Sequence, residues 1–136
     1  MKLRINQGSI QSSTADTLIV NLFDDVTVPG GATGALDQAL DGAVRDLIAA
    51  GDLTGKAGEI AVIYPRGAMA AQRVLVVGLG KRDSFNLEGV RQAAAAGIKR
   101  ARDLNAKHVA SIVHGAGIAG LPTAAAAQAT VEGTLL

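Results

Sequence analysis

The chain has 136 residues, of which 49% are hydrophobic and 18% charged, and its formal net charge is +1. This length fits one domain, which buries roughly two-thirds of the surface of its unfolded chain. The absence of cysteine excludes disulfides, thiolate metal sites and a cysteine nucleophile. No apolar stretch approaches the roughly 18 residues that span a bilayer, and the N-terminus lacks the apolar run of a secretory signal. We therefore expect a soluble, cytoplasmic protein that does not enter a membrane.

The first half of the chain predicts two strands and one helix. Leu3 and Ile5 alternate with polar residues, which predicts a half-buried strand. Residues 17–22 form a continuous β-branched and apolar run, which is typical of a strand buried on both faces. After a loop over residues 24–31, Thr33 is the expected N-cap of a long helix that Gly51 ends.

The second half predicts two more strands, a long helix, a fifth strand and a last helix. Residues 59–64 and 73–79 are expected to form neighbouring strands. Asn86 is the expected N-cap of an amphipathic helix that reaches about residue 104. Residues 107–113 read as a strand and 123–136 as an alanine-rich helix.

The order β-β-α-β-β-α-β-α predicts an α/β fold in which helices flank a mixed central sheet. Residues 1–136 are expected to form a single domain. The last predicted helix is still periodic at Leu136, without a glycine, proline or polar tail to end it. We therefore expect a fragment of a longer protein, with the helix over residues 123–136 truncated at a linker.

Two glycine-rich segments resemble nucleotide-binding motifs. Residues 115–120 have the pattern Gly-x-Gly-x-x-Gly between a predicted strand and helix, where such glycines let backbone amides approach a pyrophosphate. Pro122 follows closely, and no acidic residue lies about twenty positions further on to hold a ribose, so we favour a tight turn. Residues 78–81 lack the spacer and the Ser or Thr of a phosphate-binding loop.

Side chains that could carry chemistry are scattered. A strand that joins His108 to His114 would separate them by roughly 20 Å, which is too far for one metal ion, although His114 at the strand end remains a weak binding candidate. Asp37 and Asp41 are expected on one solvated helix face. Asp24 and Asp25 are adjacent carboxylates without further oxygen ligands nearby in sequence, which makes a poor cation site.

Charge is distributed unevenly along the chain. Residues 1–52 contain three basic and seven acidic side chains, whereas residues 81–107 contain seven basic and three acidic ones, giving −4 and +4. Arg91 and Arg102 are expected on one helix face and could form a basic stripe with Lys81 and Arg82. Such a stripe could contact nucleic acid phosphates, but we favour a solvated face or a subunit contact because no aromatic residues interleave.

Five segments together resemble the leucyl (cytosol) aminopeptidase family in order and spacing. They are Ala-Asp-Thr-Leu-Ile-Val-Asn at 15–21, Thr-Gly-Ala-Leu-Asp at 33–37, Gly-Lys-Ala-Gly-Glu at 55–59, Arg-Val-Leu-Val-Val-Gly-Leu-Gly-Lys at 73–81 and Ala-Gln-Ala-Thr-Val-Glu-Gly at 127–133. The resemblance covers nearly the whole chain. It implies an N-terminal domain that precedes a larger catalytic domain.

In that family the catalytic domain holds two divalent metal ions, manganese or zinc, with lysine, aspartate and glutamate ligands. It also carries an Asn-Thr-Asp-Ala-Glu-Gly-Arg-Leu signature, which does not occur here. The metals would activate a bridging water and polarise the scissile carbonyl of a peptide's N-terminal residue. The resemblance thus implies that this chain holds no catalytic, cofactor-binding or metal-binding residue. It also implies assembly into a homo-oligomer, usually a hexamer, and contact with the chain's own catalytic domain.

The N-terminal domain of the family is macro-domain-like, which suggests an alternative function. Macro domains bind ADP-ribose through an asparagine at the end of a buried strand and two glycine-rich loops. Residues 19–21, 30–35 and 117–120 resemble these three segments. The bulk and negative charge of residues 22–25 depart from the pattern and would oppose a pyrophosphate. The alternatives to an assembly domain are therefore an ADP-ribose or nucleotide module, or a DNA-binding domain that uses residues 81–107.

Overall fold

The computed structural model describes residues 2–6, 10–112, 114, 128, 130 and 132. Its centre is a five-stranded sheet in the order β1-β5-β2-β4-β3. Neighbouring strands run parallel except β3, which is antiparallel to β4. The strands are β1 (Lys2–Asn6), β2 (Thr17–Phe23), β3 (Ile60–Ile63), β4 (Arg73–Gly80) and β5 (His108–Ile112). The predicted mixed sheet is confirmed, with β3 and β4 as neighbours.

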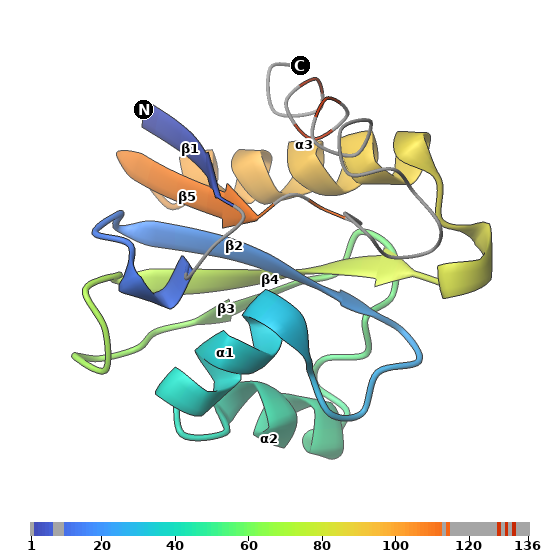
Figure 1. Cartoon of the computed structure of the whole chain (residues 1–136), viewed down its shortest axis with the longest axis horizontal. Coiled ribbons are helices and arrows are strands. Elements are labelled where there is room, and N and C mark those ends of the chain that lie inside the picture. The colour runs from blue at the N-terminus through green and yellow to red at the C-terminus, as the bar shows by residue number, and fades with distance from the viewer. Residues whose placement is uncertain are drawn as a thin grey trace.

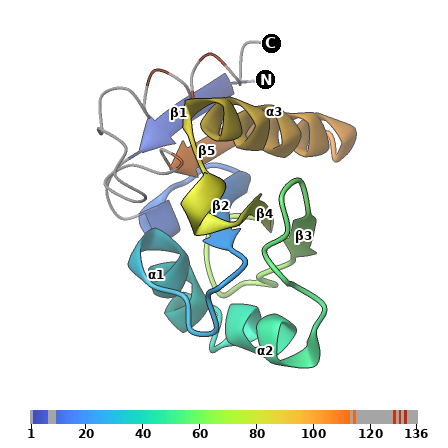
Figure 2. The ribbon, with the colours of Figure 1, turned by 90° about the vertical axis from the view of Figure 1, so that its right-hand side faces the viewer.

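Helices cover both faces of this sheet (Figure 1). The α1 helix (Gly31–Ala39) and the α2 helix (Ala43–Ala50) lie on one face, and the α3 helix (Leu87–Asp103) lies on the other. The view along the sheet in Figure 2 separates these three layers. Short 3-10 turns, η1 (Ile10–Ser12) and η2 (Arg82–Ser84), precede β2 and α3. The molecule is an α/β domain with helices on both faces of its sheet.

The central strands are buried on both faces, as predicted for residues 17–22. Ile19 packs with Val77 and Ile98 in the cluster under α3, whereas Leu18 packs with Leu36 in the cluster under α1 and α2. Successive side chains of a strand point to opposite faces, so β2 contributes alternately to both clusters. The carboxyl end of β2 is consequently held in place by the hydrophobic clusters on both faces of the sheet.

The predicted single helix from Thr33 to Gly51 is wrong, because the structure contains two helices. The chain turns at Asp41 and Gly42, whose φ angles of 57° and 85° lie in the left-handed region. The carboxylate of Asp37 then accepts hydrogen bonds from the N–H groups of Val44 and Arg45 at 2.9 and 3.0 Å, and so caps α2. Asp37 is buried, which corrects the expectation that it belongs to a solvated face, whereas Asp41 is exposed.

The other predicted helices differ in outcome. The side chain of Asn86 accepts a hydrogen bond from the N–H of Gly89 at 2.9 Å, which confirms Asn86 as the N-cap of α3. Most of the helix predicted over residues 123–136 lies outside the described residues. The three residues described there, Gln128, Thr130 and Glu132, are helical.

Candidate functional site at the carboxyl end of β2

The carboxyl end of β2 meets the start of α1. The hydroxyl of Thr33 donates a 2.7 Å hydrogen bond to the carbonyl oxygen of Asn21, which ties α1 to β2. Thr33 is therefore not the N-cap that was predicted; the N-cap is Gly30, which makes no side-chain hydrogen bond. Within the part of the chain that the structure describes, no side chain caps the first N–H groups of α1, which also have no intrahelical partner. Open α/β sheets bind ligands outside the carboxyl ends of their strands.

A buried histidine contacts the side chain of Asn21. The side-chain amide of Asn21 donates to Nδ1 of His114 at 3.0 Å, which places the proton of the neutral ring on Nε2. His114 is fully buried, and its backbone N–H donates to the hydroxyl of Thr130. The ring Nε2 has no partner among the described residues. Burial lowers the pKa of His114 to about 4, so the ring is neutral at pH 7. His114, which the sequence indicated as a weak binding candidate, is thus a buried hydrogen-bond partner of Asn21.

Two of the three macro-like segments therefore meet in the structure. Residues 19–21 and 30–35 lie together through the contact between Thr33 and Asn21. The third segment, residues 117–120, and the Gly-x-Gly-x-x-Gly pattern at 115–120 lie outside the described residues. The side chain of Asn21, which the resemblance places against a ligand, is already hydrogen-bonded to His114.

One of the two adjacent aspartates beyond β2, Asp25, belongs to an ion pair. Asp25 accepts two hydrogen bonds from the guanidinium of Arg82, at 3.1 and 3.2 Å. The same guanidinium lies 4.3 Å from the ring centre of Phe23, which packs edge-on against Phe85. The hydrogen bond from Arg82 lowers the pKa of Asp25. Asp25 therefore serves this ion pair, and its neighbour Asp24 is exposed.

The glycines in residues 78–81 are needed for packing. A Cβ on Gly78 would collide with the carbonyl oxygen of Lys56, because the turn over residues 55–58 lies directly on β4. A cavity of about 320 Å³ lies beside this turn, at the start of α3. Its polar lining residues are Lys81, Ser84, Asn86, Glu88 and Gln92. The rejection of a phosphate-binding loop at residues 78–81 agrees with this structural role.

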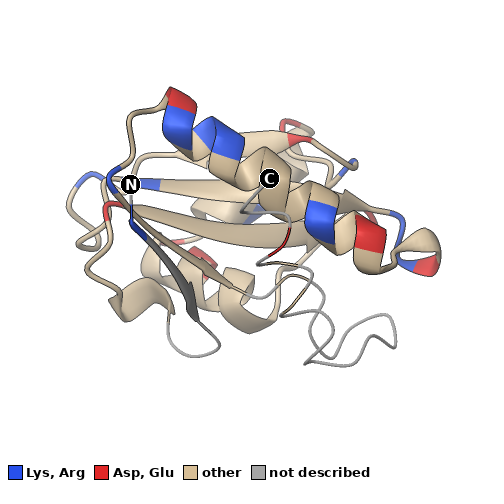
Figure 3. Cartoon of the chain, turned by 90° about the horizontal axis from the view of Figure 1, so that it is seen from above, with Lys and Arg blue, Asp and Glu red and all other residues tan. Residues whose placement is uncertain are grey.

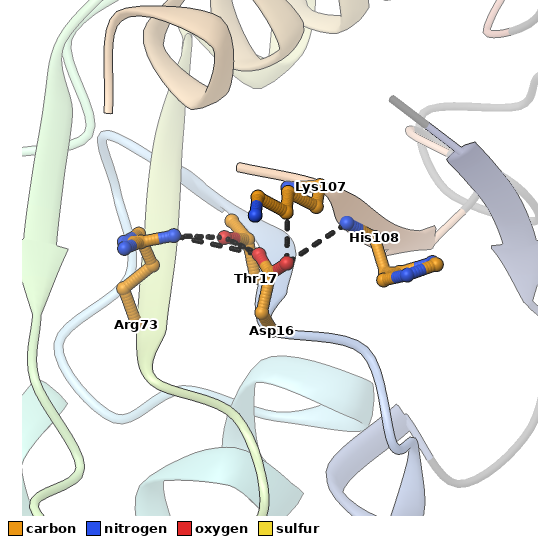
Figure 4. A network of polar contacts seen from close by, with 5 residues as sticks. All are labelled: Asp16, Thr17, Arg73, Lys107 and His108. Carbon is orange, nitrogen blue, oxygen red and sulfur yellow. Dashed lines mark hydrogen bonds and ion pairs between the residues drawn. The ribbon is translucent and has the colours of Figure 1, made fainter. Parts of the chain in front are cut away.

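A polar network joins three strands at the opposite end of the sheet (Figure 4). One carboxylate oxygen of Asp16 accepts from the Thr17 hydroxyl at 2.7 Å and from Arg73 at 3.4 Å. The other accepts from the backbone N–H groups of Lys107 and His108, both at 2.9 Å. Burial alone would raise the pKa of Asp16, but these donors together lower it. His108 thus contributes its backbone here, in agreement with its reading as an ordinary sheet residue.

The predicted basic stripe is divided by ion pairs. Arg91 pairs with Glu88 at 3.3 Å and with Glu132 at 3.0 Å, and Arg82 pairs with Asp25. Figure 3 shows the Lys and Arg residues of α3 in two groups, toward the two ends of the helix. In the part of the chain that the structure describes, the exposed residues Lys99, Arg100 and Arg102 of the C-terminal group have no ion pair.

Sequence comparison identifies the family. The model of the cytosol aminopeptidase family, N-terminal domain, matches residues 19–136. The chain belongs to this family. A probable cytosol aminopeptidase of Roseiflexus castenholzii is 36% identical over 113 residues, which are 83% of this chain and 21% of the relative. One from Xylella fastidiosa strain M12 is 35% identical over 108 residues, 79% of this chain and 22% of the relative. This cytosol aminopeptidase family member thus spans about a fifth of the length of these relatives.

Solved structures confirm the macro-domain-like fold. The macrodomain of Mycobacterium tuberculosis DarG superposes with a TM-score of 0.78 at 17% identity, over 98% of this chain and 90% of that one. A tomato leucine aminopeptidase variant superposes with a TM-score of 0.72 at 17% identity, over 99% of this chain and 27% of that one. A Trypanosoma brucei macrodomain in complex with ADP superposes with a TM-score of 0.78 at 15% identity, over 98% of this chain and 55% of that one. The N-terminal domain of this cytosol aminopeptidase family member therefore has the macrodomain fold.

Neither a metal cluster nor a membrane span is found where the structure can be described. Over residues 10–112 and the few described beyond them, no group of three or more His, Asp or Glu side chains could hold a metal ion. No helix within the described ranges is both long and apolar enough to cross a bilayer.

Proposed function

We propose that this chain is the accessory and assembly domain of a cytoplasmic leucyl aminopeptidase that works as a homo-oligomer, usually a hexamer. The observation that carries the proposal is the position of the match: the N-terminal family model covers 118 of its residues, 19–136, and the chain spans only 21% to 22% of the named relatives. The remaining length of the relatives supplies the peptidase. There, two divalent metal ions, manganese or zinc, would hydrolyse N-terminal residues from peptides.

The accessory role predicts that the isolated chain has no peptidase activity. Purified chain with manganese should not hydrolyse leucine p-nitroanilide, whereas the Roseiflexus castenholzii relative should. Turnover by the isolated chain that follows its concentration and resists further purification would overturn the proposal.

A chimera tests the assembly role directly. This chain replaces the matching N-terminal fifth of the Roseiflexus castenholzii relative, and a deletion of that fifth is the control. We expect the chimera to form the same oligomer as the intact relative, by analytical ultracentrifugation, and the deletion to form a smaller one. A deletion that assembles and turns over substrate like the intact relative would contradict an assembly role.

Nucleotide binding is the second candidate, and the uncapped start of α1 beside Asn21 favours it. The likeness to a macrodomain in complex with ADP supports the same candidate. Calorimetric titration with ADP-ribose tests it, with the Gly30→Glu variant as control, because a carboxylate at the start of α1 would repel a pyrophosphate. Heat from the wild-type chain and none from the variant would support this candidate. No heat from either at millimolar ligand would remove it.

DNA binding is a third candidate that rests on Lys99, Arg100 and Arg102. Their lack of ion pairs with described residues leaves three positive charges near the end of α3. Retention on a DNA column that weakens as salt rises, and that fails in the triple alanine variant, would support this role. Absent or salt-insensitive retention would exclude it.

A further inference from the structure

The edge strand β3 is open and uncharged, unlike the opposite edge of the sheet. β1 contains Lys2 and Arg4, which are the charged residues that proteins place on edge strands to prevent pairing. β3 has the sequence Ile-Ala-Val-Ile and continues into Tyr64, with no charge and no proline over residues 60–64. Tyr64 is 57% exposed. An edge of this kind is a template for a further strand.

The hydrogen bonds to β4 determine which residues of β3 face outward. The N–H of Gly78 donates to the carbonyl oxygen of Glu59 at 2.7 Å, and the register places Ile60 opposite Val77. In an antiparallel pair, alternate residues exchange both hydrogen bonds with the partner. Ile60 and Val62 therefore direct their N–H and C=O groups away from β4, and no described residue binds these groups. Tyr64 is the next residue in this alternation, so its backbone groups also point away from β4.

We propose that β3 pairs with β3 of a second copy, antiparallel and about a two-fold axis at Val62. In this register Val62 faces its own counterpart, and Ile60 faces Tyr64 of the second copy. It is the symmetric register that uses the outward groups of all three residues. The pairing joins two five-stranded sheets into one, and such a symmetric contact is self-complementary. The inference rests on the proposed assembly function and names the surface that carries it.

Side chains and charges agree with this register. Directly opposite residues lie on the same face of a sheet, so Tyr64 covers Ile60 of the second copy. Pro65 is not one of the alternate residues whose backbone groups point outward, so its missing N–H removes no hydrogen bond between the copies. The charged residues in the segment 58–66 are Glu59 and Arg66. The antiparallel register places the turn with Arg66 of each copy beside Glu59 of the other. The carboxylate of Glu59 also accepts hydrogen bonds from Thr54 and Gly55, so unlike charges lie near each other at both ends.

We take a second copy as the occupant of this edge. The described residues near the C-terminus contact other elements: His114 contacts Asn21 in β2, and Glu132 contacts Arg91 in α3. None of the described contacts of these residues reaches β3. The symmetry of the register and the unlike charges at its ends instead fit a copy of β3 itself.

A cysteine at the axis tests the register, because the chain has no cysteine of its own. Opposite residues of a hydrogen-bonded pair have Cα atoms about 5.5 Å apart, within the disulfide range. We expect the Val62→Cys variant of the 136-residue chain to form a covalent dimer under mild oxidation. Tyr64→Cys is the matched control, since residue 64 of one copy lies roughly 13 Å from residue 64 of the other. Equal crosslinking of both variants, or none at position 62, overturns the register.

A charge at the edge tests the association without crosslinking. Tyr64→Lys should weaken self-association of the chain about tenfold or more in sedimentation equilibrium. Val28→Lys is the control, because Val28 is 70% exposed and belongs to the loop between β2 and α1. A chain that is monomeric throughout, or a dimer that Tyr64→Lys leaves unchanged, overturns the proposal. If the chimera with the relative still assembles in that case, the accessory function stands and only the β3 surface is wrong.

Discussion

Asn21 and His114 are 93 positions apart in the chain, yet their side chains meet at 3.0 Å beside the start of α1. The contact joins β2 to the residues that follow β5. It also leaves Nε2 of His114 buried without a hydrogen-bond partner among the described residues. A buried ring of this kind resists protonation, because the charged form would lose its hydration.

The stability of the domain should therefore fall in mild acid. The pKa of His114 is about 4 in the folded chain and 6.5 without the fold, so the unfolded chain binds more protons between these values. The free energy of unfolding should decrease as the pH falls from 6.5 to 4, by about 3 kcal/mol over the window. Urea titrations across this range measure it. The His114→Gln variant should lose most of this slope, and an unchanged slope would contradict the assignment.

Removal of the α2 cap should destabilise the domain by about 2–3 kcal/mol, because two N–H groups and a guanidinium lose their partner. Asp37 is buried and its ion pair with Arg45 is 2.7 Å long. The test is urea denaturation of Asp37→Ala. Asp46→Ala is the control, since Asp46 is exposed in the first turn of α2 and should change stability by less than about 0.5 kcal/mol. Equal effects of both would show that Asp37 does not act as a cap.

Neutralising Asp16 should loosen the end of the sheet shown in Figure 4. We expect Asp16→Asn to cost about 1–3 kcal/mol at neutral pH, because four donors lose an ionised acceptor. The pKa of Asp16 is lowered below 3.8 in the folded chain. The stabilisation by the ionised Asp16 is thus complete above pH 3.8. It disappears as the pH falls through the pKa that Asp16 has in the folded chain. The difference between wild type and variant should shrink in that range, below the window of His114; a constant difference would contradict the role of the charge.

A methyl group at Gly78 should displace the turn over residues 55–58. The carbonyl oxygen of Lys56 occupies the space that the Cβ would need, and backbone cannot give way as a flexible side chain can. We expect Gly78→Ala to destabilise the domain by about 2 kcal/mol or more. Gly30→Ala should stay within about 1 kcal/mol of wild type, since nothing lies within 4 Å of the position that its methyl group would take. Thermal unfolding of the two variants tests the close approach of Lys56 to Gly78. Equal stability of the two variants would contradict it.

Much of the fold could be predicted because it depends on local pattern. The apolar run over residues 17–22 and the cap at Asn86 needed only neighbouring residues to define β2 and α3. The break between α1 and α2 could not be predicted in this way. The apolar stripe continues across it, and the break depends on a left-handed turn at Gly42 together with a cap that Asp37 supplies from seven positions away.

The candidate site was only partly predictable. The resemblance indicated that residues 19–21 and 30–35 belong together, and the structure confirms their contact. The burial of His114 and its bond to Asn21 had no local signal, because they depend on how the residues after β5 return to β2. Strand spacing could exclude a metal shared by His108 and His114, but it could not show what His114 contacts.

The strand order also constrains how the domain forms during synthesis. β1 and β2 emerge first, but they are not neighbours, because β5 lies between them and pairs with both. β1 therefore waits for residues 108–112 before it gains a partner in the sheet. Closing so long a stretch of chain is slow, and an unpaired strand can meet a wrong partner meanwhile. The charges of Lys2 and Arg4 would disfavour such wrong pairing while β1 has no partner.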